Sequence, residues 1–269
     1  MSGVARTVLS PSSRTIIEHA PAKRAKAGIA YAEGERVIAE ALQGSWRCDV
    51  LFIDPDFADT AGGAALLKLA KGRAVSIQYA SPKAFEKLSE LPAPPPAGLI
   101  VRPPEGGAFS GATRRSGHRR SQWLVLDRVN DPGNAGAMIR TAAAFGFSVV
   151  LTAGSVRMTN EKMIRASAGI CFHEGVLHAA GDPADVAQYF RSQSIRTLVL
   201  APRAEAVIGA VGDAAEAIAL VLGNEAAGVD ESIWGWAEAV RIPMQAGVES
   251  LNVSISAAIA MYELSRGRA

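Results

Sequence analysis

The sequence predicts an α/β protein with two domains, and three features support this expectation. Short apolar runs typical of buried strands alternate with helix-like runs along most of the chain. At 269 residues, of which 49% are hydrophobic, the chain is long enough to bury two cores. A Pro-, Gly- and Arg-rich stretch interrupts the alternation between residues 91 and 117, and this composition is typical of a linker.

Charge and cysteine content argue against several classes of protein. The formal net charge of +2 argues against a protein that binds its partners through overall charge, but it does not exclude a local basic patch. Cys48 and Cys171 form no CxxC pair, so we expect neither a disulfide framework nor a structural zinc site. The N-terminus lacks the apolar core of a signal peptide, and no apolar run has membrane-spanning length. We therefore expect a cytoplasmic protein with no bound metal and no membrane association.

The first domain is expected over residues 1–102. Residues 1 to about 30 have mixed composition, and we expect irregular structure there. The run GERVIAEALQG places Ile38 and Leu42 on one helical face, with Gly44 in position to end the helix. The elements expected after it are a strand over Val50–Asp54, a helix over AALLKLAK, a strand over AVSIQYA, a helix over SPKAFEKLSEL that begins at Ser81, and a strand over GLIVR.

A linker is expected over residues 103–120. Its basic run RRSGHRR contains the arginines Arg114, Arg115, Arg119 and Arg120. This composition is compatible both with a solvated hinge and with a phosphate-contacting segment beside an RNA site.

The second domain is expected over residues 121–269, where the alternating units become longer. Strands are expected over WLVLD, SVVLT, RTLVL, AIALVLG and AVRIP, and helices over Ala135–Phe145, Glu161–Ala168, Asp182–Gln193 and Val253–Arg266. Polar turns follow three of these strands, and open α/β sheets bind ligands where strands end in this way.

The first polar turn runs from Asn130 to Gly136 and enters a helix whose free N–H groups suit an anion. Arg140 follows Asn134 by six residues, so the two share one side only if Asn134 precedes the helix. The alternative is that Asn134 caps the helix and Arg140 is a surface residue.

The second polar turn, GNEAAG, follows a very apolar strand. A carboxylate there is costly without partners, so Glu225 either holds an amino or hydroxyl group of a ligand or caps a helix at Asp230. The turn is not GxGxxG, and the chain contains no P-loop motif, which argues against ordinary dinucleotide binding and P-loop hydrolysis.

The third polar segment runs from Ile242 to Asn252. Ser250 and Asn252 are both good candidates to cap the Ala-rich helix that follows. No His or Asp is placed near Ser250 for a recognisable triad, so we do not expect an acyl-transfer nucleophile.

Taken together, these segments resemble the SpoU (TrmH-type) RNA 2′-O-ribose methyltransferases of the SPOUT superfamily. The shared motifs are N-x-G-x-x-x-R at Asn134, Gly136 and Arg140, G-N-E-x-x-G at 223–228, I-P-M followed by E-S-L-N-V-S within 242–254, and RASAG at 165–169. The first domain resembles the small substrate-binding domain, related to the L30e ribosomal-protein fold, that precedes many such catalytic domains.

The resemblance implies a homodimer whose parallel-sheet domain contains a deep trefoil knot, an exception to the rule that chains avoid knots. S-adenosylmethionine is expected in the knot, beside an active site at the dimer interface. The residues that match the donor-binding positions of the family are Leu200, Ala201, Gly223, Asn224, Ile242, Met244 and Leu251.

The resemblance assigns activation of the ribose 2′-hydroxyl to Arg140. Because a guanidinium stays protonated, we expect Arg140 to bind the adjacent phosphate and to stabilise charge as the hydroxyl loses its proton. The residues expected to orient ribose and donor are Asn134, Glu225, Ser250 and Asn252. Arg165 and the four linker arginines are expected to contact RNA, and the chemistry requires no metal.

The expected substrate is ribosomal RNA of the 23S type, because smaller tRNA-directed members often lack the first domain. A tRNA 2′-O-methyltransferase and an rRNA methyltransferase that confers antibiotic resistance are the alternatives within this class. Outside it, a non-catalytic RNA-binding protein remains, as does a small-molecule nucleotide-binding enzyme, which the missing phosphate-loop motifs disfavour.

Overall fold

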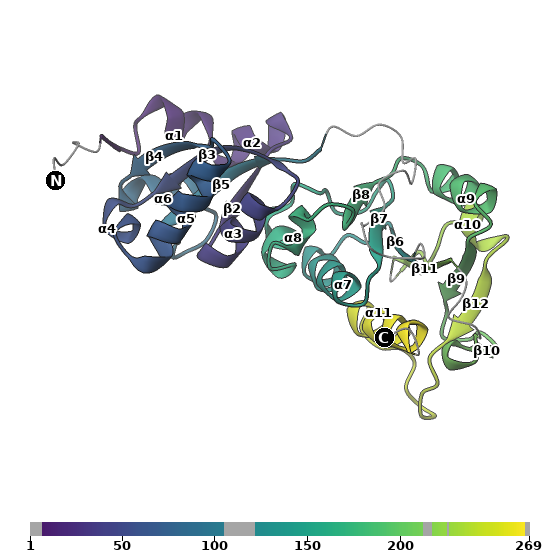
Figure 1. The fold of residues 1–269 in the computed structure, drawn as a ribbon. Coiled ribbons are helices and arrows are strands. Elements are labelled where there is room, and N and C mark those ends of the chain that lie inside the picture. Colours follow the sequence, from purple (N-terminus) through teal and green to yellow (C-terminus); the bar gives the residue numbers. More distant parts are fainter. Residues whose placement is uncertain (1–6, 105–121, 212–216, 225, 267–269) are drawn as a thin grey trace. The chain divides into compact units, whose positions relative to one another are not determined.

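The computed structural model describes residues 7–104, 122–211, 217–224 and 226–266. The chain forms two compact units, and each has its own sheet (Figure 1). Unit 1 comprises Met1–Pro104 together with Thr159–His173, and unit 2 comprises Glu105–Met158 together with Glu174–Ala269. Thr159–His173 therefore packs with the first unit, although its sequence lies within the second predicted domain.

Unit 1 contains a five-stranded mixed sheet in the order β1-β4-β3-β5-β2, in which β5 runs antiparallel to β3 and β2. Its elements are β1 (Val8–Leu9), α1 (Arg14–Glu18), α2 (Pro21–Ala27), β2 (Ala30–Glu33), α3 (Glu35–Gln43), β3 (Arg47–Ile53), α4 (Pro55–Ala58), α5 (Ala61–Gly72), β4 (Ser76–Ala80), α6 (Pro82–Leu88), β5 (Ala97–Arg102), α8 (Glu161–Ala166) and the 3-10 helix η1 (Ile170–Phe172). The strands and helices predicted between residues 34 and 102 are confirmed.

The expectation of irregular structure up to residue 30 is wrong. The short helices α1 and α2 form there, and Ile16 of α1 is completely buried. Two signals marked α2: Pro21 occupies its first turn, and Gly28 ends it in the left-handed region at φ 64°.

Two ion pairs attach α8 to the rest of unit 1. The side chain of Arg24 is 1% exposed, and its Nε and Nη2 each donate to a carboxylate oxygen of Glu161 at 2.9 Å. Arg165 Nη1 lies 2.8 Å from Oε1 of the buried Glu33, whose other oxygen accepts a hydrogen bond from Ser89. Because removing one member of such a pair leaves a buried charge without compensation, these contacts make α8 part of the folded first unit.

Unit 2 contains a seven-stranded sheet in the order β10-β12-β9-β11-β6-β7-β8, in which every pair is parallel. Its elements are β6 (Gln122–Asp127), α7 (Pro132–Ala144), β7 (Ser148–Leu151), β8 (Leu177–Ala179), α9 (Pro183–Ser192), β9 (Arg196–Leu200), β10 (Ala206–Val207), the 3-10 helix η2 (Ile208–Ala210), β11 (Ile218–Gly223), α10 (Glu231–Trp234), β12 (Glu238–Arg241) and α11 (Val253–Ser265). The predicted parallel sheet is confirmed.

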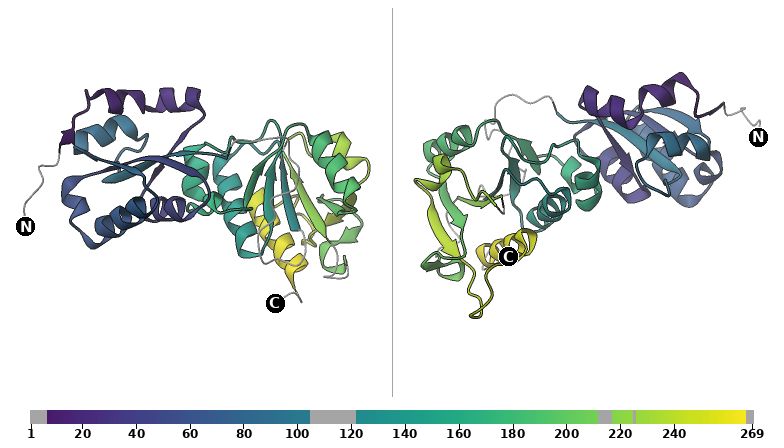
Figure 2. Two further views of the ribbon diagram at one scale, coloured as in Figure 1. Left: turned by 45° about the horizontal axis from the view of Figure 1, so that its top comes forward. Right: turned by 180° about the vertical axis from the view of Figure 1, so that it is seen from behind.

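Helices cover both faces of this sheet, with α7 and α11 on one side and α9 and α10 on the other (Figures 1 and 2). Successive residues of a strand point to opposite faces. Trp123 and Val125 of β6 accordingly pack with Phe190 of α9 and Ile233 of α10, while the intervening Leu124 faces the opposite layer. Because both faces of the sheet are buried, the sequences of these strands are continuous apolar runs.

Two features are absent from the described residues. They contain no helix that is both long and apolar enough to cross a membrane. Nor do they contain a group of three or more His, Cys, Asp or Glu side chains placed to hold a metal ion.

The buried pair in unit 1 leads to a stability prediction. Arg24→Ala should destabilise the first unit by about 3–5 kcal/mol, because Glu161 then stays buried without its cation. Urea unfolding of the full chain, followed by circular dichroism, measures the change. Arg14→Ala is the matched control, since Arg14 pairs with Glu18 on the surface and should leave the unfolding curve unchanged. Equal curves for the two variants would contradict the assigned role of Arg24.

Candidate functional site

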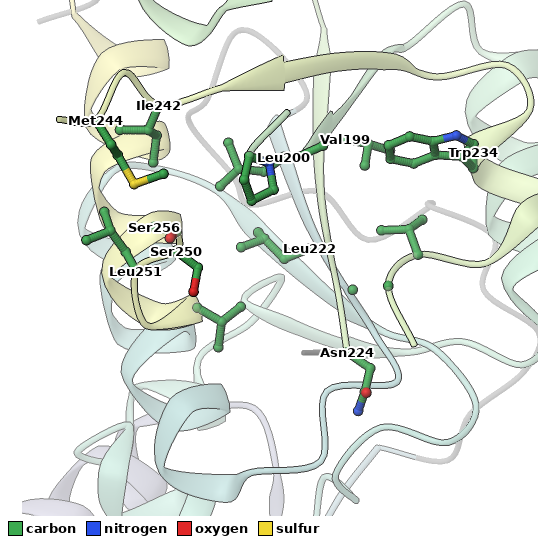
Figure 3. Close-up of a pocket in the computed structure, with 16 residues that line it drawn as sticks. Val199, Leu200, Leu222, Asn224, Trp234, Ile242, Met244, Ser250, Leu251 and Ser256 are labelled. Atoms are coloured by element: carbon green, nitrogen blue, oxygen red, sulfur yellow. The ribbon is translucent and has the colours of Figure 1, made fainter. Parts of the chain in front are cut away.

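A pocket of about 350 Å³ lies at the carboxyl ends of β9 and β11, with the segment after β12 forming another wall (Figure 3). The lining residues are Val199, Leu200, Ala201 and Pro202 from β9 and its turn, Leu222, Gly223, Asn224, Gly228 and Val229 from β11 and its turn, Trp234 from α10, and Ile242, Met244, Ser250, Leu251, Val253 and Ser256 after β12.

All seven residues predicted to bind the methyl donor line this pocket. They are Leu200, Ala201, Gly223, Asn224, Ile242, Met244 and Leu251. The walls combine aliphatic side chains with the backbone of tight turns, a mixture that suits a flat apolar ring with a polar rim. Their common location is observed, and donor binding stays a prediction.

Gly223 permits a close approach of backbone to backbone in the pocket wall. A Cβ atom at this position would lie 2.3 Å from the carbonyl carbon and oxygen of Gly228. No side chain fits there, so the turn after β11 folds back on itself because residue 223 is glycine.

Sequence reasoning missed other parts of the lining, of which Trp234 is the largest side chain. Trp234 is 46% exposed, and its indole lies at one end of the pocket in Figure 3, with Met244 at the other end. Val199 and Ser256 also line the pocket without belonging to the motifs used above. Their positions depend on how distant elements pack, and no local pattern marks them.

Asn134 and Asn252 meet beside the pocket. Asn252 Nδ2 donates to Asn134 Oδ1 at 3.1 Å, although the residues are 118 positions apart. Asn252 also caps α11, because its Oδ1 accepts hydrogen bonds from the N–H groups of Ser254 at 2.9 Å and Ile255 at 3.4 Å. One side chain therefore both starts the last helix and connects it to α7.

The possibility that Asn134 caps α7 is wrong. Pro132 begins the helix, and Asp131 is the cap, with its carboxylate accepting from the N–H of Asn134 at 2.6 Å. Asn134 thus lies inside the first turn, and six residues of helix rotate Arg140 by about 120° away from it. Arg140 is exposed, and none of the other described residues forms an ion pair or hydrogen bond with its side chain.

Helix α10 is also capped by an aspartate. The carboxylate of Asp230 accepts from the Ser232 N–H at 3.0 Å and from the Ser232 hydroxyl at 2.8 Å. These two hydrogen bonds, together with the charge of Arg128, hold the pKa of Asp230 below its ordinary value. The role of capping α10, considered above for Glu225, therefore belongs to Asp230.

The remaining predicted residues differ in their surroundings. Ser250 is exposed and lines the pocket. Arg165 is in the ion pair with Glu33, and its side chain is 26% exposed. The predicted positions that lie outside the described residues are Glu225, Arg114, Arg115, Arg119 and Arg120.

Two family models match the chain. Residues 121–262 match the SpoU rRNA Methylase family, and residues 31–105 match the model described as RNA 2′-O ribose methyltransferase substrate binding. The first match spans more than half of the 269 residues.

Curated relatives cover most of the chain. The 23S rRNA (adenosine(1067)-2′-O)-methyltransferase of Streptomyces laurentii is 31% identical over 75% of this chain and 73% of its own length. The 23S rRNA (guanosine(2553)-2′-O)-methyltransferase RlmP of Bacillus subtilis (strain 168) is 29% identical over 91% of this chain and 92% of its own length.

Solved structures show the same fold. A structure described as an RNA 2′-O ribose methyltransferase has a TM-score of 0.76 and 25% identity, covering 97% of this chain and 99% of its own. The SpoU methyltransferase AviRb from Streptomyces viridochromogenes, in complex with AdoMet, has a TM-score of 0.78 at 23% identity, covering 95% of this chain and 98% of its own.

The two roles of Asn252 can be separated by substitution. Asn252→Ala removes the cap of α11 and should lower the free energy of unfolding by about 1 kcal/mol. Asn252→Asp keeps an accepting oxygen at the helix start and should be nearly as stable as the natural protein. Urea unfolding measures both, with Ser250→Ala as an exposed control. An Asn252→Asp variant as unstable as Asn252→Ala would show that the hydrogen bond to Asn134, and not the cap, provides the stability.

Proposed function

We propose, because this chain belongs to the SpoU rRNA Methylase family, that it transfers a methyl group from S-adenosylmethionine to a ribose 2′-hydroxyl of structured RNA. One observation carries the proposal. The motif segments that follow β11 and β12 border a single pocket together with the end of β9, and the Asn134–Asn252 hydrogen bond lies beside it.

The pocket is assigned to the methyl donor. When bound, S-adenosylmethionine supplies an electrophilic methyl group on its sulfonium. Leu200, Leu222 and Ile242 provide apolar walls for an adenine ring, and the tight turn at Gly223 places backbone polar groups at the rim. This chain then has to hold the ribose hydroxyl in line with the methyl group, which accounts for most of the catalytic task.

Arg140 is assigned to the RNA phosphate beside the reacting ribose. Its guanidinium is exposed and unpaired among the described residues, so it is available to an anion. Since it remains protonated, it stabilises the developing negative charge and does not act as the base. Asn134, Asn252, Ser250 and Glu225 are assigned to orienting the ribose and the donor.

The substrate-binding role is assigned to residues 1–102, the linker to 103–120 and the catalytic role to 121–269. The matches to the two family models, over 31–105 and 121–262, support this division. The linker arginines and the exposed part of Arg165 are assigned to RNA phosphates.

A homodimer is part of the proposal. The exposed apolar side chains Ile255 and Tyr262 lie seven positions apart on α11 and so share one face, near the exposed Leu251 and Val248. In a symmetric dimer, this face of one protomer would cover the same face of its partner.

The deep knot is also part of the proposal. After β12, which lies between β9 and the edge strand β10, the chain returns past the pocket, and α11 packs against α7. This course supports threading of the last segment.

We assign 23S-type rRNA as the substrate and the cytoplasm as the place where the protein acts. The names of the two curated relatives support rRNA, and the match of residues 31–105 to a substrate-binding model supports a role of the first domain in binding the RNA. A tRNA methyltransferase, an antibiotic-resistance rRNA methyltransferase and a non-catalytic RNA-binding protein are outcomes of the experiment below.

The experiment is the transfer of labelled methyl from S-adenosylmethionine to unmodified rRNA and tRNA transcripts, followed by mapping of 2′-O-methyl positions. Label on one rRNA ribose supports the proposal, and the resistance of cells carrying that modification separates a housekeeping from a resistance role. Label on tRNA alone would show that the substrate is tRNA and not rRNA. Absence of label on transcripts and on ribosomal particles, with RNA still bound, would favour the non-catalytic alternative.

Arg140→Ala should lower kcat by at least about 100-fold, because a positioned cation stabilises transition-state charge. Donor binding should remain nearly unchanged, since Arg140 does not line the pocket. Single-turnover methylation and donor titration measure the two effects. Arg157→Ala, at another exposed arginine of unit 2, is the control. An equal loss of donor binding and transfer would indicate a structural role for Arg140.

Ile255→Glu should convert the dimer to a monomer at micromolar concentration, because a charge would be placed at the centre of the apolar face. Light scattering after size-exclusion chromatography measures the mass. Ile17→Glu, at an exposed isoleucine of unit 1, is the matched control. A dimer that persists with Ile255→Glu would remove this face of α11 from the interface.

A further inference from the structure

The turn after β11, described at residues 223–224 and 226–230, forms one wall of the pocket, and hydrogen bonds from side chains fix its shape. Asn224 contributes the first set of contacts. Its Oδ1 accepts from the N–H groups of Ala226 at 2.9 Å and Ala227 at 3.0 Å, and its Nδ2 donates to the carbonyl oxygen of Arg128 at 3.2 Å. The Asn224 side chain is thus occupied mainly in holding the turn, although the residue lines the pocket.

Asp127 fixes the other end of the same turn. This carboxylate at the end of β6 is completely buried. Its Oδ2 accepts from the Asp230 N–H at 2.8 Å, and its Oδ1 accepts from the Thr152 hydroxyl at 2.8 Å. A buried carboxylate is tolerated when its oxygens are satisfied in this way, so Thr152 and the backbone of Asp230 are held in place by the charge.

Arg128 connects the two ends. Its guanidinium lies 3.3 Å from Asp127 Oδ2 and 3.5 Å from Asp230 Oδ2. Its backbone adopts the left-handed conformation at φ 56°, which is uncommon for a residue other than glycine. The same residue supplies the carbonyl oxygen that accepts from Asn224 and donates its N–H to Thr152 Oγ1 at 3.2 Å. Such strain persists where surrounding contacts determine the conformation.

We propose that Asp127, Arg128, Thr152 and Asn224, which we call the Asp127 brace, position the described residues of this turn and thereby set the affinity of the pocket for the methyl donor. The proposal rests on the proposed function, and it makes these four side chains positioning residues. Because a Cβ atom on Gly223 would collide with the backbone of Gly228, the two ends of the turn are in close contact, and a shift of the Asp230 end moves the pocket wall directly.

The test compares two buried threonines of unit 2, Thr152 directly after β7 and Thr197 in β9. Thr152→Val removes the hydroxyl that satisfies Asp127, whereas Thr197→Val removes a hydroxyl that bonds only weakly, at 3.3 Å, to the carbonyl oxygen of Ile195. Both side chains are buried, at 3% and 4% exposure. The control therefore reproduces the change in volume and polarity away from the pocket.

Calorimetric titration of the full-length protein with S-adenosylmethionine should show a roughly tenfold weaker Kd for Thr152→Val, in line with loss of a hydrogen bond to a charged group. Thr197→Val should bind as the natural protein does, and Thr152→Ser, which retains the hydroxyl, should restore binding. At saturating donor, kcat for RNA methylation should change by less than about threefold, because the brace acts on donor binding and does not touch the reacting atoms.

Amide hydrogen exchange without donor provides a second readout. Thr152→Val should speed exchange at Ala226 and Ala227, whose N–H groups donate to Asn224, and at Asp230, whose N–H donates to Asp127, and leave β9 unchanged. Asn224→Ala, which leaves the buried core intact, should give the same pattern and keeps the test available if Thr152→Val folds poorly.

The outcomes separate the two proposals. A natural protein that binds no S-adenosylmethionine would overturn the proposed function and, with it, the purpose of the brace. Donor binding by the natural protein with an unchanged Kd in Thr152→Val and Asn224→Ala would overturn the brace alone. An equal loss in Thr197→Val would also overturn it, because the effect would then reflect general loosening of the sheet.

Discussion

The common direction of the seven strands in unit 2 determines where its chemistry lies. In a parallel sheet all strands end at one edge, so the turns after β6, β9, β11 and β12 meet there whatever their separation in sequence. β11 runs between β6 and β9, and its turn therefore borders both neighbours. The pocket and the pair of asparagines, Asn134 and Asn252, follow from this arrangement.

The same burial that stabilises the sheets restricts which polar residues they tolerate. Each unit contains a carboxylate with almost no exposure, Glu33 in the first and Asp127 in the second. Each is satisfied by an arginine and a hydroxyl, and Asp127 also accepts from a backbone N–H. Because an unpaired buried charge is costly, the partners of these carboxylates are determined by the fold before any ligand binds.

Periodicity and turn residues predicted the alternation of strands and helices well, because those signals are local. The residues of the pocket were predicted through motif order and resemblance, since no local pattern brings Leu200 and Met244 together. The cap of α7 could have been predicted from the sequence. Proline favours the first helical position, so Pro132 indicates that Asp131, and not Asn134, is the cap. The ion pair that anchors α2 could not be predicted from the sequence, because the partner of Arg24 is Glu161, which lies 137 positions away.

Helix α8 shows why motif boundaries and folding units differ. The RASAG segment lies within the family match over 121–262, yet it packs with the first unit. The ring of Phe172 makes an edge contact with that of Trp46, with 5.0 Å between the ring centroids, and Glu161 neutralises Arg24. A cut at residue 121 would remove both partners and leave an apolar ring and a carboxylate without their native surroundings. Substitutions in this segment therefore act first on the stability of the substrate-binding unit, and a loss of methylation caused by them does not by itself identify a catalytic residue.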